Sequence, residues 1–114
     1  MPSLRRIGAD AEDRAARYLL GIGYTIVTRR FKSSRGELDI VALDGETIVV
    51  VEVKSSLSSS AVPEEQVSSK KSAHIVKAVD EYLYKADASE PIVRYDIIAV
   101  TPDEIRHHID AFRP

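Results

Sequence analysis

The apolar residues of this chain recur with two different periods, and the change of period divides the sequence into elements. Over residues 3–21 they recur every three to four positions, which predicts a helix that ends near Gly21. The same spacing returns over residues 64–84, directly after Pro63, and predicts a second helix. The remaining apolar runs predict strands, at residues 24–32, 38–43, 48–53, 92–100 and 105–112.

The order helix, three strands, helix and two strands predicts an α/β fold, with a mixed central sheet flanked by helices. The chain has 114 residues, which is long enough for one substantial hydrophobic core and too short for two. We therefore expect residues 1–114 to form a single domain.

The two central apolar runs predict a β-hairpin. They flank Asp44-Gly45, a dipeptide that strongly favours a two-residue hairpin turn. Pairing Leu43 with Glu46 across this turn sets the register of the whole hairpin.

In this register Asp39 lies opposite Val50, and Glu37 lies opposite Glu52. Alternate side chains of a strand point to opposite faces, so one face of the hairpin is entirely apolar. The other face gathers four charged residues near the open end of the hairpin: Glu37, Asp39, Glu52 and Lys54. A slip of one residue would move Asp39 to the opposite face from Glu52.

Several carboxylates in one corner of a valine-rich hairpin need a cation, because opposed like charges destabilise a sheet and unpaired buried charges are costly. Mg²⁺ suits carboxylate oxygens, keeps several waters and commonly bridges to phosphate. We therefore expect Asp39 and Glu52 to hold Mg²⁺ or Mn²⁺, with Lys54 holding or polarising a bound water.

Two points of this interpretation have alternatives. Glu52 and Lys54 also fit a half-solvated strand in which charged residues simply alternate with valines. Glu37 is either a further metal ligand or the partner of Arg35 or Lys54 in a salt bridge.

Charge and composition narrow the classes of function. The net charge of −2 argues against a general nucleic-acid coat protein, although a nuclease needs only a local basic patch. Such a patch, which also fits a solvated turn, precedes the hairpin at Arg29, Arg30, Lys32 and Arg35. The chain has no cysteine, which excludes disulfide frameworks, thiolate zinc sites and cysteine nucleophiles.

The sequence offers no signal peptide and no apolar run that approaches the length of a membrane span. We therefore expect a cytoplasmic protein without membrane association. The adjacent His107 and His108 point to opposite faces of a strand and cannot form one site together.

The residues gathered so far resemble the pattern of the PD-(D/E)xK nuclease superfamily, whose fold is the restriction-endonuclease-like fold. An acidic helix residue, an Asp on the second strand and Glu-x-Lys on the third fall on Glu12, Asp39, Glu52 and Lys54. Three motifs are similar to the small bacterial YraN-like family, predicted endonucleases related in fold to archaeal Holliday-junction resolvases. They are Gly8-x-x-x-Glu12-x-x-Ala15-x-x-Tyr18-Leu19, Arg35-Gly36-Glu37-Leu38-Asp39-Ile40-Val41-Ala42 and Val51-Glu52-Val53-Lys54.

The resemblance implies an αβββαβ core, here with an extra C-terminal strand. It makes Asp39 and Glu52 metal ligands and Lys54 the base or stabiliser that positions water. Glu12 becomes an auxiliary acidic residue, and Arg29 and Gln66 match weaker positions that would contact nucleic acid. The chain departs from the pattern at Ser56 and Arg30, where the family often has Arg and Asn, and both departures concern phosphate contacts.

The sequence thus predicts an endonuclease that depends on Mg²⁺ or Mn²⁺ and hydrolyses phosphodiester bonds in structured or branched DNA. One alternative is a non-catalytic module that binds nucleic acid or a partner protein and retains the nuclease fold. Another is a salt-bridge cluster at the edge of a homodimer, formed by Glu37, Glu52, Lys54 and Arg35.

Overall fold

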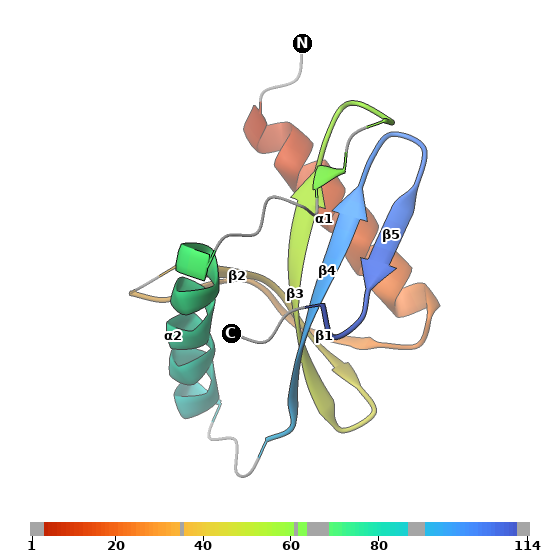
Figure 1. Cartoon of the computed structure of the whole chain (residues 1–114). Coiled ribbons are helices and arrows are strands. Elements are labelled where there is room, and N and C mark those ends of the chain that lie inside the picture. The colour runs from red at the N-terminus through yellow and green to blue at the C-terminus, as the bar shows by residue number, and fades with distance from the viewer. Residues whose placement is uncertain (1–3, 35, 61, 64–68, 87–90, 112–114) are drawn as a thin grey trace.

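A computed structural model of the chain describes residues 4–34, 36–60, 62–63, 69–86 and 91–111 (Figure 1). It confirms a mixed α/β fold with two helices and five strands, in the predicted order along the chain. The elements are α1 (Leu4–Gly21), β1 (Thr25–Lys32), β2 (Glu37–Asp44), β3 (Thr47–Ser55), α2 (Ser69–Lys85), β4 (Val93–Val100) and β5 (Ile105–His108).

The five strands form one mixed sheet in the order β1-β2-β3-β4-β5. Neighbouring strands are antiparallel except β3 and β4, which run parallel and are joined through α2. None of the described helices is long and apolar enough to cross a membrane.

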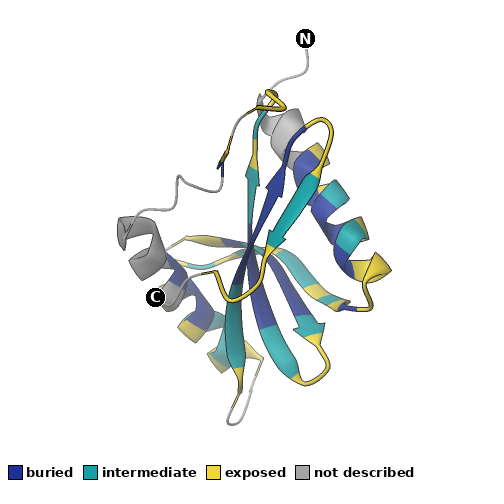
Figure 2. Cartoon of the chain, turned by 45° about the vertical axis from the view of Figure 1, so that its right-hand side comes forward, coloured by how far each residue is buried: buried dark blue, intermediate teal, exposed yellow. Residues whose placement is uncertain are grey.

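The two helices cover opposite faces of the sheet, which explains why β3 is rich in valine. Val49 and Val51 pack in one hydrophobic cluster with Ala15 of α1, whereas Val50 packs in another with Val79 of α2. Since consecutive side chains of a strand point to opposite faces, β3 is buried on both sides. Figure 2 shows the buried positions concentrated in the central strands.

The hairpin turn lies one residue later than predicted. The structure pairs Asp44 with Thr47, so Gly45 and Glu46 are the central residues of the turn, and Ile40 pairs with Val51. Gly45 has a φ of 61°, which suits glycine at the first central position of a hairpin turn. The predicted pairing of Leu43 with Glu46 was therefore wrong. It made Gly45 the second central residue of the turn, whereas Gly45 is the first central residue in the structure.

This correction changes the partners in the hairpin but leaves the faces of the paired residues unchanged. Leu38 is an exception to the predicted faces, since it packs in the cluster of α2 and not with Ile40 and Ala42. Moving the turn by one residue shifts every partner by two positions, and side chains alternate with a period of two. The charged residues therefore still stand at every second position counted from the facing pair Val41 and Val50. They are Glu37, Asp39, Glu52 and Lys54.

The last strand is shorter than predicted. It ends at His108 rather than continuing toward residue 112, because the chain turns at Asp110, which has a φ of 54°. The expected start of the second helix, at residues 64–68, lies outside the described residues; the described helix begins at Ser69.

A buried ion network beneath β5 accounts for this chain reversal. The Asp96 side chain is fully buried, and its carboxylate accepts hydrogen bonds from Arg94 Nε and Nη2, each at 2.9 Å. It also accepts from His107 Nε2 at 2.7 Å and from the backbone N–H of Asp110 at 2.9 Å. Burial alone would raise the pKa of the Asp96 carboxyl, but these hydrogen bonds outweigh it and hold the pKa at about 2.

We expect this network to make stability depend on pH. The pKa of Asp96 is lower in the folded chain than its usual value of 3.8, so its contribution is present above that pH and is lost as the pH falls toward 2. The shift corresponds to about 2 kcal/mol. Urea unfolding between pH 6 and pH 2 should show this loss.

The matched variant Asp96→Asn should lower the free energy of unfolding by about 3–5 kcal/mol at pH 7, because it leaves Arg94 without its buried partner. It should also lose this part of the acid dependence. Asp80→Asn, on the exposed face of α2, is the control and should behave as wild type. A near-neutral Asp96→Asn protein would contradict the structural role of the network.

Candidate functional site

The carboxylate of Asp39 lies between β2 and β3, at the end of their paired segment. Its Oδ2 accepts a hydrogen bond of 2.9 Å from the backbone N–H of Val53. The regular pairing of the two strands ends at Ile40 and Val51, and its continuation places Asp39 opposite Glu52 instead of opposite Val50. The structure therefore brings Asp39 next to the segment that carries Glu52 and Lys54.

Glu52 and Lys54 form an ion pair at the C-terminal end of β3. Lys54 Nζ lies 3.4 Å from Glu52 Oε1, and the two side chains are only 14% and 7% exposed, respectively. Burying both charges is costly unless they are paired, so the pair is not explained by a half-solvated strand with alternating charges. The burial of this ion pair therefore favours the predicted metal site over a half-solvated strand.

The donor set at this point fits a hard divalent ion. Asp39 and Glu52 offer carboxylate oxygens from facing strands, and Mg²⁺ is commonly held by one or two carboxylates, with water and substrate phosphate completing the shell. In the part of the chain that the structure describes, no group of three or more acidic, histidine or cysteine side chains could hold a metal. Among the described residues, Asp39 and Glu52 are thus the ones that would hold such an ion.

Glu37 does not join the other two carboxylates in such a group. It is exposed at the start of β2, where its partner in the neighbouring strand is Lys32. Oppositely charged residues at facing positions of a sheet attract each other. The position thus favours an electrostatic role for Glu37 over metal ligation, with Lys32 as its facing residue on β1.

Glu12 lies on α1 and is held by two consecutive arginines of β1. Its Oε1 accepts from Arg29 Nε and from Arg30 Nε, each at 3.2 Å, and Glu12 is only 8% exposed. Both of these hydrogen bonds come from arginines of the predicted basic patch. The structure therefore connects Glu12 with the predicted phosphate-binding residues rather than with Asp39 or Glu52.

The backbone of Arg30 explains how two neighbouring arginines reach one carboxylate. Its φ of 54° is unusual for a residue with a side chain and breaks the alternation of faces along β1. The next residue, Phe31, consequently packs with the cluster of α2, with its ring centroid 5.3 Å from that of Tyr82.

The predicted basic patch is only partly assembled. Arg29 and Arg30 line an open hollow of about 400 Å³ together with Asp13, which also forms an ion pair with Arg29. This hydrogen bond from Arg29 lowers the pKa of the Asp13 carboxyl, so the acid stays ionised beside the arginines. Arg35 and Gln66, both predicted to contact nucleic acid, lie outside the described residues.

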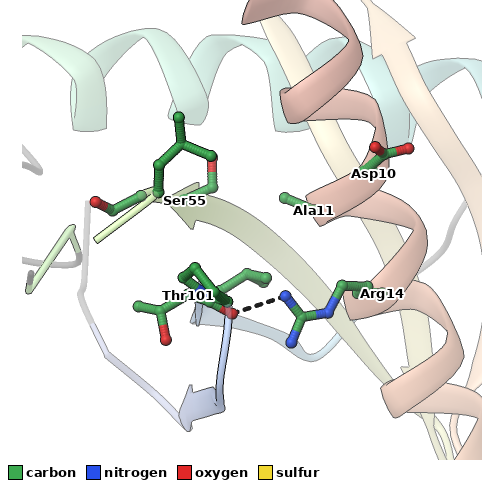
Figure 3. A pocket seen from close by; sticks show the side chains of 9 residues that line it. Asp10, Ala11, Arg14, Ser55 and Thr101 are labelled. Carbon is green, nitrogen blue, oxygen red and sulfur yellow. Dashed lines mark hydrogen bonds between the residues drawn. The ribbon is translucent and has the colours of Figure 1, made fainter. Parts of the chain in front are cut away.

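Two residues of the structure stand out that the sequence analysis did not identify. Arg14 and Thr101 line a cavity at the C-terminal ends of β3 and β4 (Figure 3). Ligands of open α/β sheets commonly bind beyond the carboxyl ends of the strands, so the position of Thr101 directly after an apolar strand was the available signal.

Comparisons with known proteins cover this whole region. The sequence model of the uncharacterised protein family UPF0102 matches residues 11–100. A UPF0102 protein of Persephonella marina is 43% identical over 106 residues, which are 92% of this chain and 91% of the relative. Another, from Chlorobium limicola, is 38% identical over 117 residues, with 93% and 91% covered. The matched region includes Glu12, Asp39, Glu52 and Lys54.

The hydrogen bond between Asp39 and Val53 predicts different effects of two substitutions on stability. Asp39→Ala should lower the free energy of unfolding by about 1–3 kcal/mol, because the N–H of Val53 loses its acceptor in a partly buried position. Asp39→Asn keeps an acceptor oxygen and should stay within about 0.5 kcal/mol of wild type. Urea denaturation measures both, and equal stabilities of the two variants would contradict the assigned bond.

Proposed function

The chain belongs to the uncharacterised protein family UPF0102, and we propose that it is a metal-dependent endonuclease that hydrolyses phosphodiester bonds in structured or branched DNA. Membership confirms the resemblance to the YraN-like family. The wider assignment to the PD-(D/E)xK superfamily is part of the proposal. The observation that carries it is the hydrogen bond of Asp39 to Val53, the residue between the buried pair Glu52 and Lys54.

The architecture is compatible with this proposal. The order α1, β1, β2, β3, α2 and β4 agrees with the αβββαβ core that the resemblance implies, and β5 is the extra C-terminal strand. The proposed site lies on the two central strands β2 and β3, which pair antiparallel. Sites on regular elements hold their side chains in defined positions, as catalysis requires.

In the proposed mechanism Asp39 and Glu52 bind Mg²⁺ or Mn²⁺. When bound, the ion supplies Lewis-acid chemistry, polarising a phosphoryl oxygen and lowering the pKa of water. The N–H of Val53 orients the carboxylate of Asp39, and the burial of Glu52 strengthens its electrostatic interactions. Lys54, beside Glu52, orients the attacking water or stabilises charge that develops on the phosphate.

The remaining predicted residues would bind the DNA backbone. Arg29 and Arg30 would contact phosphates from the open hollow on β1, with Lys32, Arg35 and Gln66 extending the surface. Glu12 then has a positioning role, since it holds the side chains of both arginines. The role of auxiliary acidic residue, which the resemblance implies for Glu12, stays a prediction.

The ion pairs of the arginines also support a second candidate, a module that binds nucleic acid or a partner without turnover. Glu12 and Asp13 neutralise part of the basic patch, and Ser56 stands where the family often has Arg. Such a module would bind branched DNA without cleaving it. The predicted salt-bridge cluster at a homodimer edge stays a prediction, and the pair of Lys54 with Glu52 is one of its contacts.

We expect wild-type protein to nick four-way and flap DNA in the presence of Mn²⁺ or Mg²⁺ and to lose this activity in EDTA. Asp39→Asn removes a ligand charge while keeping the hydrogen-bond acceptor, and should reduce the rate at least about 100-fold. Gel assays on labelled four-way, flap, duplex and single-stranded DNA measure the rates.

Glu46→Gln is the matched control, since Glu46 is exposed at the opposite end of the same hairpin and should leave the rate unchanged. Wild-type protein that binds branched DNA but cleaves none of the substrates would favour the binding module. Equal cleavage by wild type and Asp39→Asn would show that a contaminating nuclease or another site is responsible.

A further inference from the structure

Arg14 on α1 carries a partly buried charge that has no acidic partner among the described residues. Its Nη1 donates a hydrogen bond of 2.7 Å to the backbone carbonyl of Thr101, just after β4 (Figure 3). The other partly buried arginines that the structure describes each form an ion pair with a carboxylate; they are Arg29, Arg94 and Arg106. Arg14 is thus a charge that has been partly removed from water without a described counter-ion.

The acidic neighbours of Arg14 on α1 do not supply this counter-ion. Asp10, one helical turn earlier, is exposed, and Figure 3 shows its carboxylate directed away from the guanidinium. Asp13 forms its ion pair with Arg29. The carbonyl of Thr101 takes only one of the several N–H donors of Arg14, so the other donors can bind an anion.

Arg14 lines an open cavity of about 270 Å³ at the C-terminal ends of the parallel strands β3 and β4. Ser55 and Ser56 line the same cavity, directly after Lys54. The Oγ of Ser56 accepts a hydrogen bond of 3.1 Å from the backbone N–H of Ser58, which leaves its own O–H to donate. Arginine and serine side chains commonly contact the phosphates of nucleic acids, so the polar groups of this cavity have the chemistry of a phosphate contact.

The strand order places Arg14 on the opposite side of the proposed metal site from Arg29 and Arg30. Strands β1, β3 and β4 run in the same direction, so their C-terminal ends lie at one edge of the sheet. The metal site on β2 and β3 lies between β1, which carries the two arginines, and the end of β4, which Arg14 contacts. Neighbouring strands are about 4.8 Å apart, so β1 and β4 are separated by about 14 Å. A DNA strand that crosses this edge therefore meets arginines on both sides of the scissile phosphate.

Helix α1 positions the cations on both sides. Glu12 holds the side chains of Arg29 and Arg30 toward β1. Arg14 stands two residues later on α1, and side chains at this spacing lie on different sides of a helix. The same turn of α1 thus serves the two ends of the edge.

We propose that Arg14 binds a backbone phosphate of the nucleic acid on the β4 side of the metal site, with the hydroxyls of Ser55 and Ser56 as further donors. The inference rests on the proposed function and extends it, because it assigns the bound strand a path across the end of the sheet from β1 toward β4. A guanidinium can hold a phosphate by two parallel hydrogen bonds, and partial burial strengthens the attraction.

The test measures binding of the protein to fluorescently labelled four-way DNA in EDTA, between about 50 and 200 mM KCl. The logarithm of the binding constant falls linearly with the logarithm of the salt concentration, with a slope of about −0.9 for each phosphate contact. Arg14→Gln should therefore make the slope shallower by about 0.9 and weaken binding at least about fivefold at the lowest salt concentration.

Arg14→Lys keeps the positive charge and should keep the slope of wild type. Both variants retain a donor for the carbonyl of Thr101, so their melting temperatures should stay within about 4 °C of wild type. If Arg14 only fastened α1 to the end of β4, the two variants would bind DNA alike. Lys77→Gln is the charge-matched control, because Lys77 is exposed on α2, on the other face of the sheet, and this variant should bind DNA as wild type does.

A second readout locates the contact along the DNA. Single phosphates are replaced by neutral methylphosphonates, one in each DNA, and every DNA is titrated with wild type and with Arg14→Gln. One replacement should weaken binding by wild type about fivefold and leave binding by Arg14→Gln unchanged, because the variant has already lost the charge that this phosphate meets.

Three results would overturn the inference: a wild-type slope in Arg14→Gln, equal losses in Arg14→Gln and Arg14→Lys, or no methylphosphonate that distinguishes wild type from Arg14→Gln. Wild-type protein that binds no DNA would overturn the proposed function as well. Because the titration contains no metal and reads no cleavage, a protein that binds DNA through Arg14 but never cleaves it would keep this inference and lose the enzyme.

Discussion

The pairing of β2 with β3 determines where the charged groups of the candidate site lie. The turn at Gly45 sets the register, and this register brings the carboxylate of Asp39 to the N–H of Val53. Both strands are buried against helices, so a slip of one residue would exchange their two faces and place charges in a hydrophobic cluster. The hydrophobic packing thus holds the carboxylates together against their repulsion, and the proposed function depends on it.

Asp96 and Glu52 are both buried acidic residues, but they have different surroundings. The surroundings of Asp96 indicate a structural role, and those of Glu52 fit the proposed functional role. Asp96 is surrounded by fixed donors, from Arg94, His107 and the backbone of Asp110, which keep it ionised and bind β5 to the sheet. Glu52 has the lysine Lys54 as its ion-pair partner, at the end of β3 where the chain leaves the sheet. An ammonium on a long side chain beside two carboxylates is an arrangement suited to a metal and its phosphate substrate.

Hydrophobic periodicity was sufficient to predict the helices, the order of the elements along the chain and the faces of the hairpin residues from Ile40 to Val51, but not the face of Leu38, which packs in the cluster of α2. The faces of these residues were predicted correctly although the turn was not, because the observed register shifts each partner by two positions. Other features depend on contacts that no local pattern encodes. Arg30, whose backbone is left-handed, donates a hydrogen bond to Glu12, which lies on a helix 18 residues earlier. The hydrogen bond between Asp96 and His107 joins β4 to β5, and the sequence analysis gave this histidine no structural role.

The central claim is that Asp39 and Glu52 together bind a divalent ion. Crystals of the protein soaked in Mn²⁺, with diffraction data collected at the manganese absorption edge, test it most directly. The account predicts an anomalous peak beside both carboxylates, at about 2.0–2.2 Å from their oxygens, that disappears in Glu52→Gln crystals. A map without a peak at this position, or a peak that persists unchanged in the variant, would contradict it.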